Sequence, residues 1–348
     1  MAAIPLGPDH SAGPLDVNAS DGFVAGPSNA YGLSVSPAGE LQARFKMSAL
    51  PMSRHEHWRL AYRENRYCRR LTQDELNQRI RDIFLNMLRL TPEGKVGLPA
   101  MSAQAIQWMV SWTHVLEEMK LRHGPYPKGF TSDILHREPY PDFAGTLAQT
   151  AASVLSSRAV ASQDLLIKYG RPHFMTALYE HGRFRVQSAS YYGRADHNGA
   201  VRDDELALQI SLSVRRDDVC KVVSNPEEVP PEYPGQRMNF RYEHPIDYWV
   251  YCLTSSVEPR LFVDFNALAC VVVRNRSEFI RRLKAVEGRF FPGARVHAGA
   301  AEYIDPCRPA GARIFLPMSK HFRYAYQQEF RIVWEPSTRQ KKIGRAHV

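Results

Sequence analysis

Hydrophobic positions repeat with the spacing of helices in the first part of the chain and with that of strands in the second. From Leu76 to Leu88, apolar residues return every three or four positions, which is the period of one helix face. A second segment, starting near Ser102, shows the same period. From Leu165 onward, short apolar or alternating runs replace it, as in strands. Helices followed by a mostly antiparallel sheet with few helices predict an α+β fold.

Capping signals mark the ends of the predicted helices. Thr72 and Glu75 have the spacing of a capping box, in which each side chain accepts a hydrogen bond from the other residue's backbone. Gly124 is expected to end the second long helix, and a further helix is expected over residues 142–157. These signals predict a helical domain or cap over residues 54–157.

The second part of the chain, residues 165–335, is predicted to form one sheet domain. Residues 225–244 are rich in proline and are expected to form a loop. Two helices are expected, one beginning at Pro172 and ended by Gly182, the other over residues 277–286. The predicted strands cover residues 165–167, 184–190, 206–214, 248–253, 261–265, 269–273, 295–304 and 322–334.

Both ends of the chain differ in composition from its middle. Residues 1–43 contain no lysine or arginine and are rich in Gly, Pro, Ser and Ala, which predicts a disordered segment or a natural start at Met47 or Met52. Residues 337–348 are predicted to be a tail. The last six of them resemble a translated sequencing adapter.

Composition indicates a cytoplasmic globular protein. The 348 residues are 44% hydrophobic and 23% charged, and no apolar run is long enough to span a membrane. No secretory signal is expected at the N-terminus. The cysteines form no C-x-x-C pair, which favours buried reduced thiols over disulfides or a structural zinc site. They are Cys68, Cys220, Cys252, Cys270 and Cys307.

A formal net charge of +9 favours anionic partners such as nucleic acid or a dinucleotide. The arginines are scattered along the sequence, so a solvated basic surface explains the charge equally well. The sequence does not determine the oligomeric state.

Polar residues collect at the joints of the first predicted strand–helix–strand unit, and joints are where binding residues often lie. The first strand delivers Lys168, Tyr169 and Gly170 to the start of the helix. The second strand leads through Ser188 and Ser190 into a pair of tyrosines that begins at Tyr191.

A second group of polar residues lies in the last predicted strand. With a period of two, Gln327, Glu329 and Arg331 share one face of this strand. A carboxylate within an aromatic, β-branched strand is costly to bury unless it is paired or used. One interpretation is therefore a structural ion pair between Glu329 and Arg331 or a lysine.

The other interpretation is catalytic, because Gln327-x-Glu329 resembles the Q/E-x-E motif of ADP-ribosyltransferases. The order of Lys168-Tyr169-Gly170, the short helix and Ser188 to Tyr191 is similar to the order of binding residues in that family. The opening looks like that of DNA-modifying ADP-ribosyltransferase toxins. Residues 165–335 also resemble a large family of uncharacterised bacterial domains, through the K-Y opening, the strand around Cys270 and the terminal E-F-R.

The resemblance implies NAD as substrate and a macromolecular acceptor, either nucleic acid or protein, in a toxin or defence role. It implies that Glu329 stabilises an oxocarbenium-like transition state and that Gln327 positions the acceptor. It assigns NAD binding to residues at the joints of the first strand–helix–strand unit. They are Lys168, Tyr169, Gly170, Ser188, Ser190 and Tyr191. The chain departs from the family pattern at Lys168, where active members usually carry Arg or His.

Two alternatives remain open from the sequence. Asp203, Asp204 and Glu205 form an acidic cluster that, together with Glu329, has the ligand types of a metal-dependent nuclease. The same cluster is equally explained by ion pairs with nearby arginines. The second alternative is a catalytically inactive module that binds a nucleotide or nucleic acid.

Overall fold

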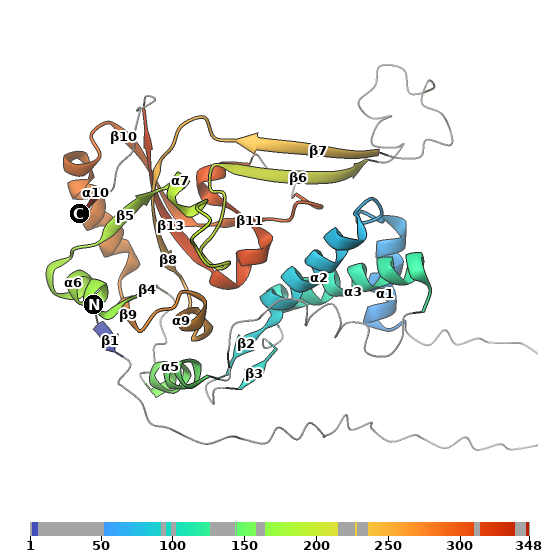
Figure 1. Cartoon of the computed structure of the whole chain (residues 1–348), viewed down its shortest axis with the longest axis horizontal. Helices are drawn as coiled ribbons and strands as arrows, with labels where there is room; N and C mark the ends of the chain where they lie inside the picture. Colours follow the sequence, from blue (N-terminus) through green and yellow to red (C-terminus); the bar gives the residue numbers. More distant parts are fainter. Residues whose placement is uncertain are drawn as a thin grey trace, which may run out of the picture. The chain divides into compact units, whose positions relative to one another are not determined.

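The fold was established from a computed structural model of the chain (Figure 1). The described residues are 2–5, 52–91, 95–98, 102–125, 143, 145–157, 164–214, 227, 236–309, 314–337 and 346–347. Most of the two predicted terminal segments and residues 228–235 of the predicted loop lie outside this set. No described helix is long and apolar enough to cross a membrane.

Three helices make up most of the first part of the chain, as predicted. The capping box of α2 is confirmed: the Thr72 hydroxyl accepts from the Glu75 amide at 3.3 Å, and the Glu75 carboxylate accepts from the Thr72 amide at 2.7 Å. Ser102 caps α3, which ends at Gly124, whose φ is 75°. The elements are α1 (Arg54–Glu64), α2 (Gln73–Met87), β2 (Arg89–Leu90), β3 (Val96–Gly97) and α3 (Ala103–His123).

An antiparallel sheet organises the second part of the chain, and the α+β fold class is confirmed. Its strands follow the order β1–β9–β4–β8–β13–β10, with β5 also paired to β8 and β14 paired to β5. The strands are β1 (Ala2–Pro5), β4 (Leu166–Gly170), β5 (Arg185–Ser188), β8 (Trp249–Thr254), β9 (Ala269–Val273), β10 (Ala294–Ala300), β13 (Glu329–Pro336) and β14 (Ala346–His347).

Helices cover both faces of this sheet. On one face, α10 (Arg276–Phe290) packs through Leu283 against Ile332 and Trp334 of β13, and α6 (Pro172–His181) packs nearby on β9. On the other face, α5 (Thr146–Ser157) and α9 (Arg260–Asp264) pack on β4 and β9. Burial of these apolar faces fixes which side chains of each strand point into the core.

Smaller elements complete the described chain. A long two-stranded ribbon is formed by β6 and β7, and η3 precedes β13 and contacts α2. Their bounds are α7 (Ala189–Tyr192), β6 (Ala207–Val214), β7 (Gln236–Glu243), β11 (Glu302–Ile304), η2 (Leu316–Met318), β12 (Ser319–His321) and η3 (Phe322–Gln327).

Predictions were wrong at residues 189–190, which lie in α7 rather than in the expected strand, and at three further internal segments. Residues 261–265 lie in and just after α9 rather than in a strand, because a short apolar run is equally compatible with a buried helix turn. Residues 322–327 are helical because Asn86 of α2 bonds their backbone: its amide donates to the Phe322 carbonyl, and its Oδ1 accepts from the Tyr326 amide. The predicted loop 225–244 contains strand β7, whose side chains alternate despite the prolines before it.

The predictions for the chain ends were wrong at two short segments. Ala2–Pro5 was expected to be disordered but pairs with β9 as strand β1. Ala346–His347 was expected to be tail but pairs with β5 as strand β14. Backbone hydrogen bonding to an existing strand edge needs no particular side chain, so composition alone does not reveal it.

Candidate functional site

A cluster of four buried charges lies where β13 begins. The Glu329 carboxylate accepts from the Arg331 Nε at 2.7 Å and from the Lys320 Nζ at 2.6 Å. The Arg331 guanidinium also reaches the Glu205 carboxylate, with a shortest N–O distance of 2.7 Å. All four side chains are buried. The cluster is therefore balanced, with two acids and two bases, and it includes the Glu329–Arg331 ion pair that the sequence suggested.

Burial and neighbouring charges move the pKa values of the two acids in opposite directions. Burial raises the pKa of Glu329, whereas the positive charges of Arg331 and Lys320 lower it. The effect of the charges is larger, so the pKa of Glu329 is well below the usual range. Burial raises the pKa of Glu205 to about 7, although Arg331 and Lys320 oppose this shift. Near neutral pH, Glu329 is therefore ionised, and Glu205 holds its proton more tightly than a free glutamate does.

A cavity of about 200 Å³ opens beside this cluster and contains several of the predicted site residues. Lys168 and Tyr169 of β4 line it together with Gln327 and Glu329, although more than 150 positions separate the two pairs. Its walls are Ile167, Lys168, Tyr169, Tyr192, Ala200, Val201, Glu205, Cys252, Leu253, Thr254, Phe265, Lys320, Gln327 and Glu329.

The Lys168 side chain starts from the sheet face opposite to that of Glu329. Ile167 and Glu329 both pair with Thr254 and so share a face, which places Lys168 on the other one. Its ammonium donates to the Cys252 carbonyl at 2.7 Å and lies 4.6 Å from the centre of the Tyr251 ring. Burial lowers the pKa of Lys168, while Cys252 and Glu329 oppose this shift. Lys168 thus borders the cavity from an interior strand, with its side chain on the opposite sheet face from Glu329.

The neighbours of Lys168 are held by core contacts. The Tyr169 hydroxyl donates to the Glu258 carbonyl at 3.2 Å, and its ring meets that of Phe262 edge-on. A side chain at Gly170 would come within 2.8 Å of the Met175 Cε, so this glycine permits close packing of α6 on the sheet. Gly170 is not among the residues that line the cavity.

The predicted residues of the second strand do not join this cavity. Ser188 and Ser190 are 3.1 Å apart through their hydroxyls, and Ser190 donates to the Asp247 carboxylate at 2.6 Å. The Tyr191 ring contacts the guanidinium of Arg194. Instead, its neighbour Tyr192 lines the cavity. Because the chain turns helical at Ala189, the expected strand alternation ends before these residues.

Gln327 lines the cavity, but not through the expected strand. It is the last residue of η3, and β13 begins only at Glu329 after Gln328, whose φ is 43°. The Gln327 Oε1 accepts from the Lys320 Nζ at 3.1 Å, and its Nε2 donates to the Ala200 carbonyl at 2.8 Å. Lys320 therefore joins the two motif residues, a role that no spacing in the sequence indicated.

The acidic cluster does not assemble with Glu329 as four neighbouring ligands. Asp204 is exposed and lies 3.7 Å from Arg241. Glu205 points into the charge cluster, where Lys320 and Arg331 hold the positions next to the acids. In the described part of the chain, no three His, Cys, Asp or Glu side chains are grouped so that they could hold a metal ion.

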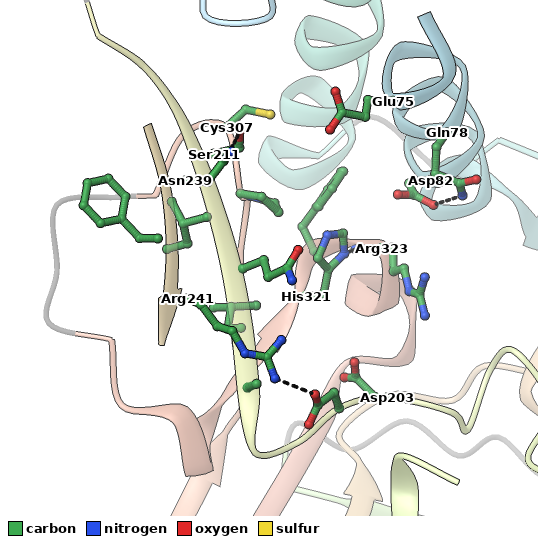
Figure 2. Close-up of a pocket in the computed structure, with 18 of the residues that line it drawn as sticks. Glu75, Gln78, Asp82, Asp203, Ser211, Asn239, Arg241, Cys307, His321 and Arg323 are labelled. Carbon is green, nitrogen blue, oxygen red and sulfur yellow. Dashed lines mark hydrogen bonds and ion pairs between the residues drawn. The ribbon is translucent and has the colours of Figure 1, made fainter. Parts of the chain in front are cut away.

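A larger groove of about 1300 Å³ is lined by other residues of the same chain segments, 199–206 and 320–329 (Figure 2). Glu75, Gln78 and Asp82 border it from α2, and Ser211, Asn239 and Arg241 border it from the β6–β7 ribbon. Asp203, His321 and Arg323 border it from the two shared segments. Charged side chains of both signs line the groove. They are Arg79, Arg194, Arg202, Arg237, Arg241, Arg323, Glu75, Asp82, Asp203 and Asp204.

Comparisons with protein-family models, curated proteins and solved structures gave no match. The similarity to ADP-ribosyltransferases therefore rests on the motif residues of this chain.

Proposed function

We propose that the protein transfers ADP-ribose from NAD to a macromolecular acceptor. The observation that carries the proposal is the cavity that the buried, ionised Glu329 lines together with Gln327 and Tyr169, and that Lys168 borders from the other sheet face. These are the residues whose sequence pattern resembles the motifs of ADP-ribosyltransferases.

Glu329 retains hydrogen-bonding capacity for a substrate. A carboxylate offers about four lone-pair positions, and Arg331, Lys320 and the Cys252 thiol occupy three of them. A ribose hydroxyl that binds at a remaining position would bring the carboxylate next to the positive charge that develops as nicotinamide leaves. In a site shielded from water, such a fixed charge stabilises the transition state more than the ground state.

The size of the cavity limits which part of NAD it would hold. Ligand pockets usually measure about 300–1,000 Å³, so a cavity of about 200 Å³ accommodates the reacting nicotinamide–ribose end and leaves the remainder outside. The acceptor has to reach this same cavity, because its nucleophile attacks the ribose carbon that nicotinamide leaves. The net charge of +9 favours a nucleic acid as that acceptor.

A catalytically inactive nucleotide-binding module is the second candidate, and one specific observation favours it. The Lys168 ammonium donates to a backbone carbonyl, and the Gln327 amide is hydrogen-bonded at both ends. Groups that are paired in this way stabilise the protein without contributing to a reaction.

The test compares Glu329→Gln with Asp305→Asn. Both changes remove a carboxylate from a buried arginine, but Asp305 pairs with Arg79 and does not line the cavity. Each should cost about 3–5 kcal/mol of unfolding free energy. With labelled NAD and with nucleic acid or protein as acceptor, Glu329→Gln should reduce transfer by about 10²–10³-fold. Asp305→Asn should leave the transfer rate of the folded protein unchanged.

NAD binding separates the two candidates. For both, NAD should raise the melting temperature of the wild type, increasingly with its concentration. Binding without transfer to any acceptor would support the inactive module. Absence of a shift at millimolar NAD, together with Mg²⁺-dependent cleavage of nucleic acid, would contradict both candidates and favour the nuclease.

A further inference from the structure

The outer edge of the β6–β7 ribbon pairs with no other described strand. β7 pairs with β6 over its whole length, from Gln236 opposite Val214 to Glu243 opposite Ala207. Among the residues that the structure describes, no strand pairs with the other side of β7, which lies outermost in the ribbon (Figure 1). An unpaired edge of eight residues is a ready template for another strand.

The ribbon has one apolar face that is only half covered. On β6, Leu208 and Ile210 are buried against Ile304 and Leu316. On β7, Tyr242 and Phe240 lie opposite these two residues, and Met238 follows on the same face. These three side chains remain 38–43% exposed. An apolar stripe along an open strand edge marks an interaction site more often than a solvated surface.

The sequence of β7 is complementary to itself in one antiparallel register. If Phe240 lies opposite its own copy, Met238 lies opposite Tyr242 of the second strand, on the apolar face. On the polar face, Arg237 then lies opposite Glu243, and Asn239 lies opposite Arg241; within the chain, Arg237 also pairs with Glu75, and Glu243 with Arg241. Aromatic and sulfur–aromatic pairs directly across two strands are stabilising. The Phe240 pair lies on the two-fold axis and occurs once, and every other pair occurs twice.

We propose that two copies of this chain associate through β7, in the antiparallel register centred on Phe240, to form a continuous four-stranded sheet. The self-complementary order of Met238, Phe240 and Tyr242 along the open edge favours a second copy over an unrelated peptide. Each copy contributes one strand edge and one apolar stripe to the contact. The buried area is therefore small, as in interfaces that dissociate readily. The proposal is independent of the transferase function.

Sedimentation of the full-length chain over a concentration series tests the association. The wild type should form a reversible dimer with a dissociation constant below about 100 μM. Phe240→Lys, which places two ammonium groups across the axis, should weaken dimerisation at least tenfold. Leu268→Lys is the matched control, because Leu268 is similarly exposed but lies outside the ribbon. A wild type that stays monomeric, or equal effects of the two variants, would overturn the proposal.

Disulfide trapping tests the register. Opposed residues of antiparallel strands have Cα atoms about 4.5–5.5 Å apart, a distance that a disulfide can bridge. Under mild oxidation, Phe240→Cys should therefore give a cross-linked dimer, because the introduced thiols meet at the axis. Tyr242→Cys and the wild type should not, because residue 242 lies opposite residue 238. Equal cross-linking of both variants, or none with Phe240→Cys, would exclude this register and the proposal with it.

Discussion

The charge cluster around Glu329 shows how far a single residue can be interpreted from its neighbours in the sequence. Arg331 lies two positions away on the same strand, so this ion pair was expected. Glu205 reaches the cluster from a segment 126 positions away, and no local pattern announces such a contact. Buried charges must be balanced by partners, because an unpaired one costs several kcal/mol. The two bases, Arg331 and Lys320, are what allow Glu329 to stay ionised inside the protein.

Glu205 should make the protein less stable as the pH rises through neutrality. Its pKa is near 4.5 when unfolded and about 7 when folded, so the folded state binds its proton more tightly. The folded state therefore holds more protons than the unfolded state in this window, and its contribution to stability falls as pH increases.

Urea denaturation at pH 5, 6, 7 and 8 measures this effect as the difference between the wild type and Glu205→Gln. The wild type should lose stability relative to the variant by about 1 kcal/mol per pH unit up to pH 7, and little beyond. A wild type that gains stability relative to the variant over this range would show that its arginine partner dominates and that the pKa of Glu205 is lowered.

At the scale of elements, the sequence predicted those whose signals are local. The capping box of α2, the glycine after α6 and the continuous apolar strand β9 lie where their patterns indicated. The errors fall where tertiary contacts decide. Residues 322–327 have strand-like side chains, but Asn86 of α2 binds their backbone in a helical turn. The predicted site residues include only part of the cavity lining, because Lys320 and Glu205 reach it from β12 and from the segment before β6, which no local pattern indicated.

Replacing Gln328, which joins η3 to β13, by glycine should make the folded protein more stable. Its φ of 43° lies in the left-handed region, which costs a residue with a Cβ about 1–2 kcal/mol. Gln328→Gly should therefore raise the unfolding free energy by up to about 1 kcal/mol, since the greater freedom of unfolded glycine offsets part of the gain. Gln328→Ala, which keeps the Cβ, is the control and should gain nothing. Thermal denaturation of both variants measures this, and a glycine variant less stable than the alanine variant would contradict it.

At the scale of the whole molecule, buried polar contacts join the helical part to the sheet domain. Arg260 of α9 donates to the Leu85 and Leu88 carbonyls at the end of α2, and to Asp264 on its own helix. Asn86 makes its bonds to the backbone of η3 from the same end of α2. Carbonyls at a helix C-terminus lack partners within the helix, so the Arg260 guanidinium satisfies them and fixes the helix against the sheet.

These contacts predict that the helical part and the sheet unfold as one unit. Arg260→Met should cost about 3–5 kcal/mol, because it leaves the Asp264 carboxylate buried without a counter-charge. Arg276→Met is the matched control: its ion pair with Asp164 is partly exposed and should cost at most about 1 kcal/mol. Hydrogen exchange followed by mass spectrometry measures the opening free energy of each segment. In the Arg260 variant, peptides from α2 and from β13 should lose protection by the same amount, since both open only when the whole unit opens. If α2 and α3 lost protection while β13 kept it, residues 54–157 would be an independent domain, and the polar contacts of Arg260 would be only local.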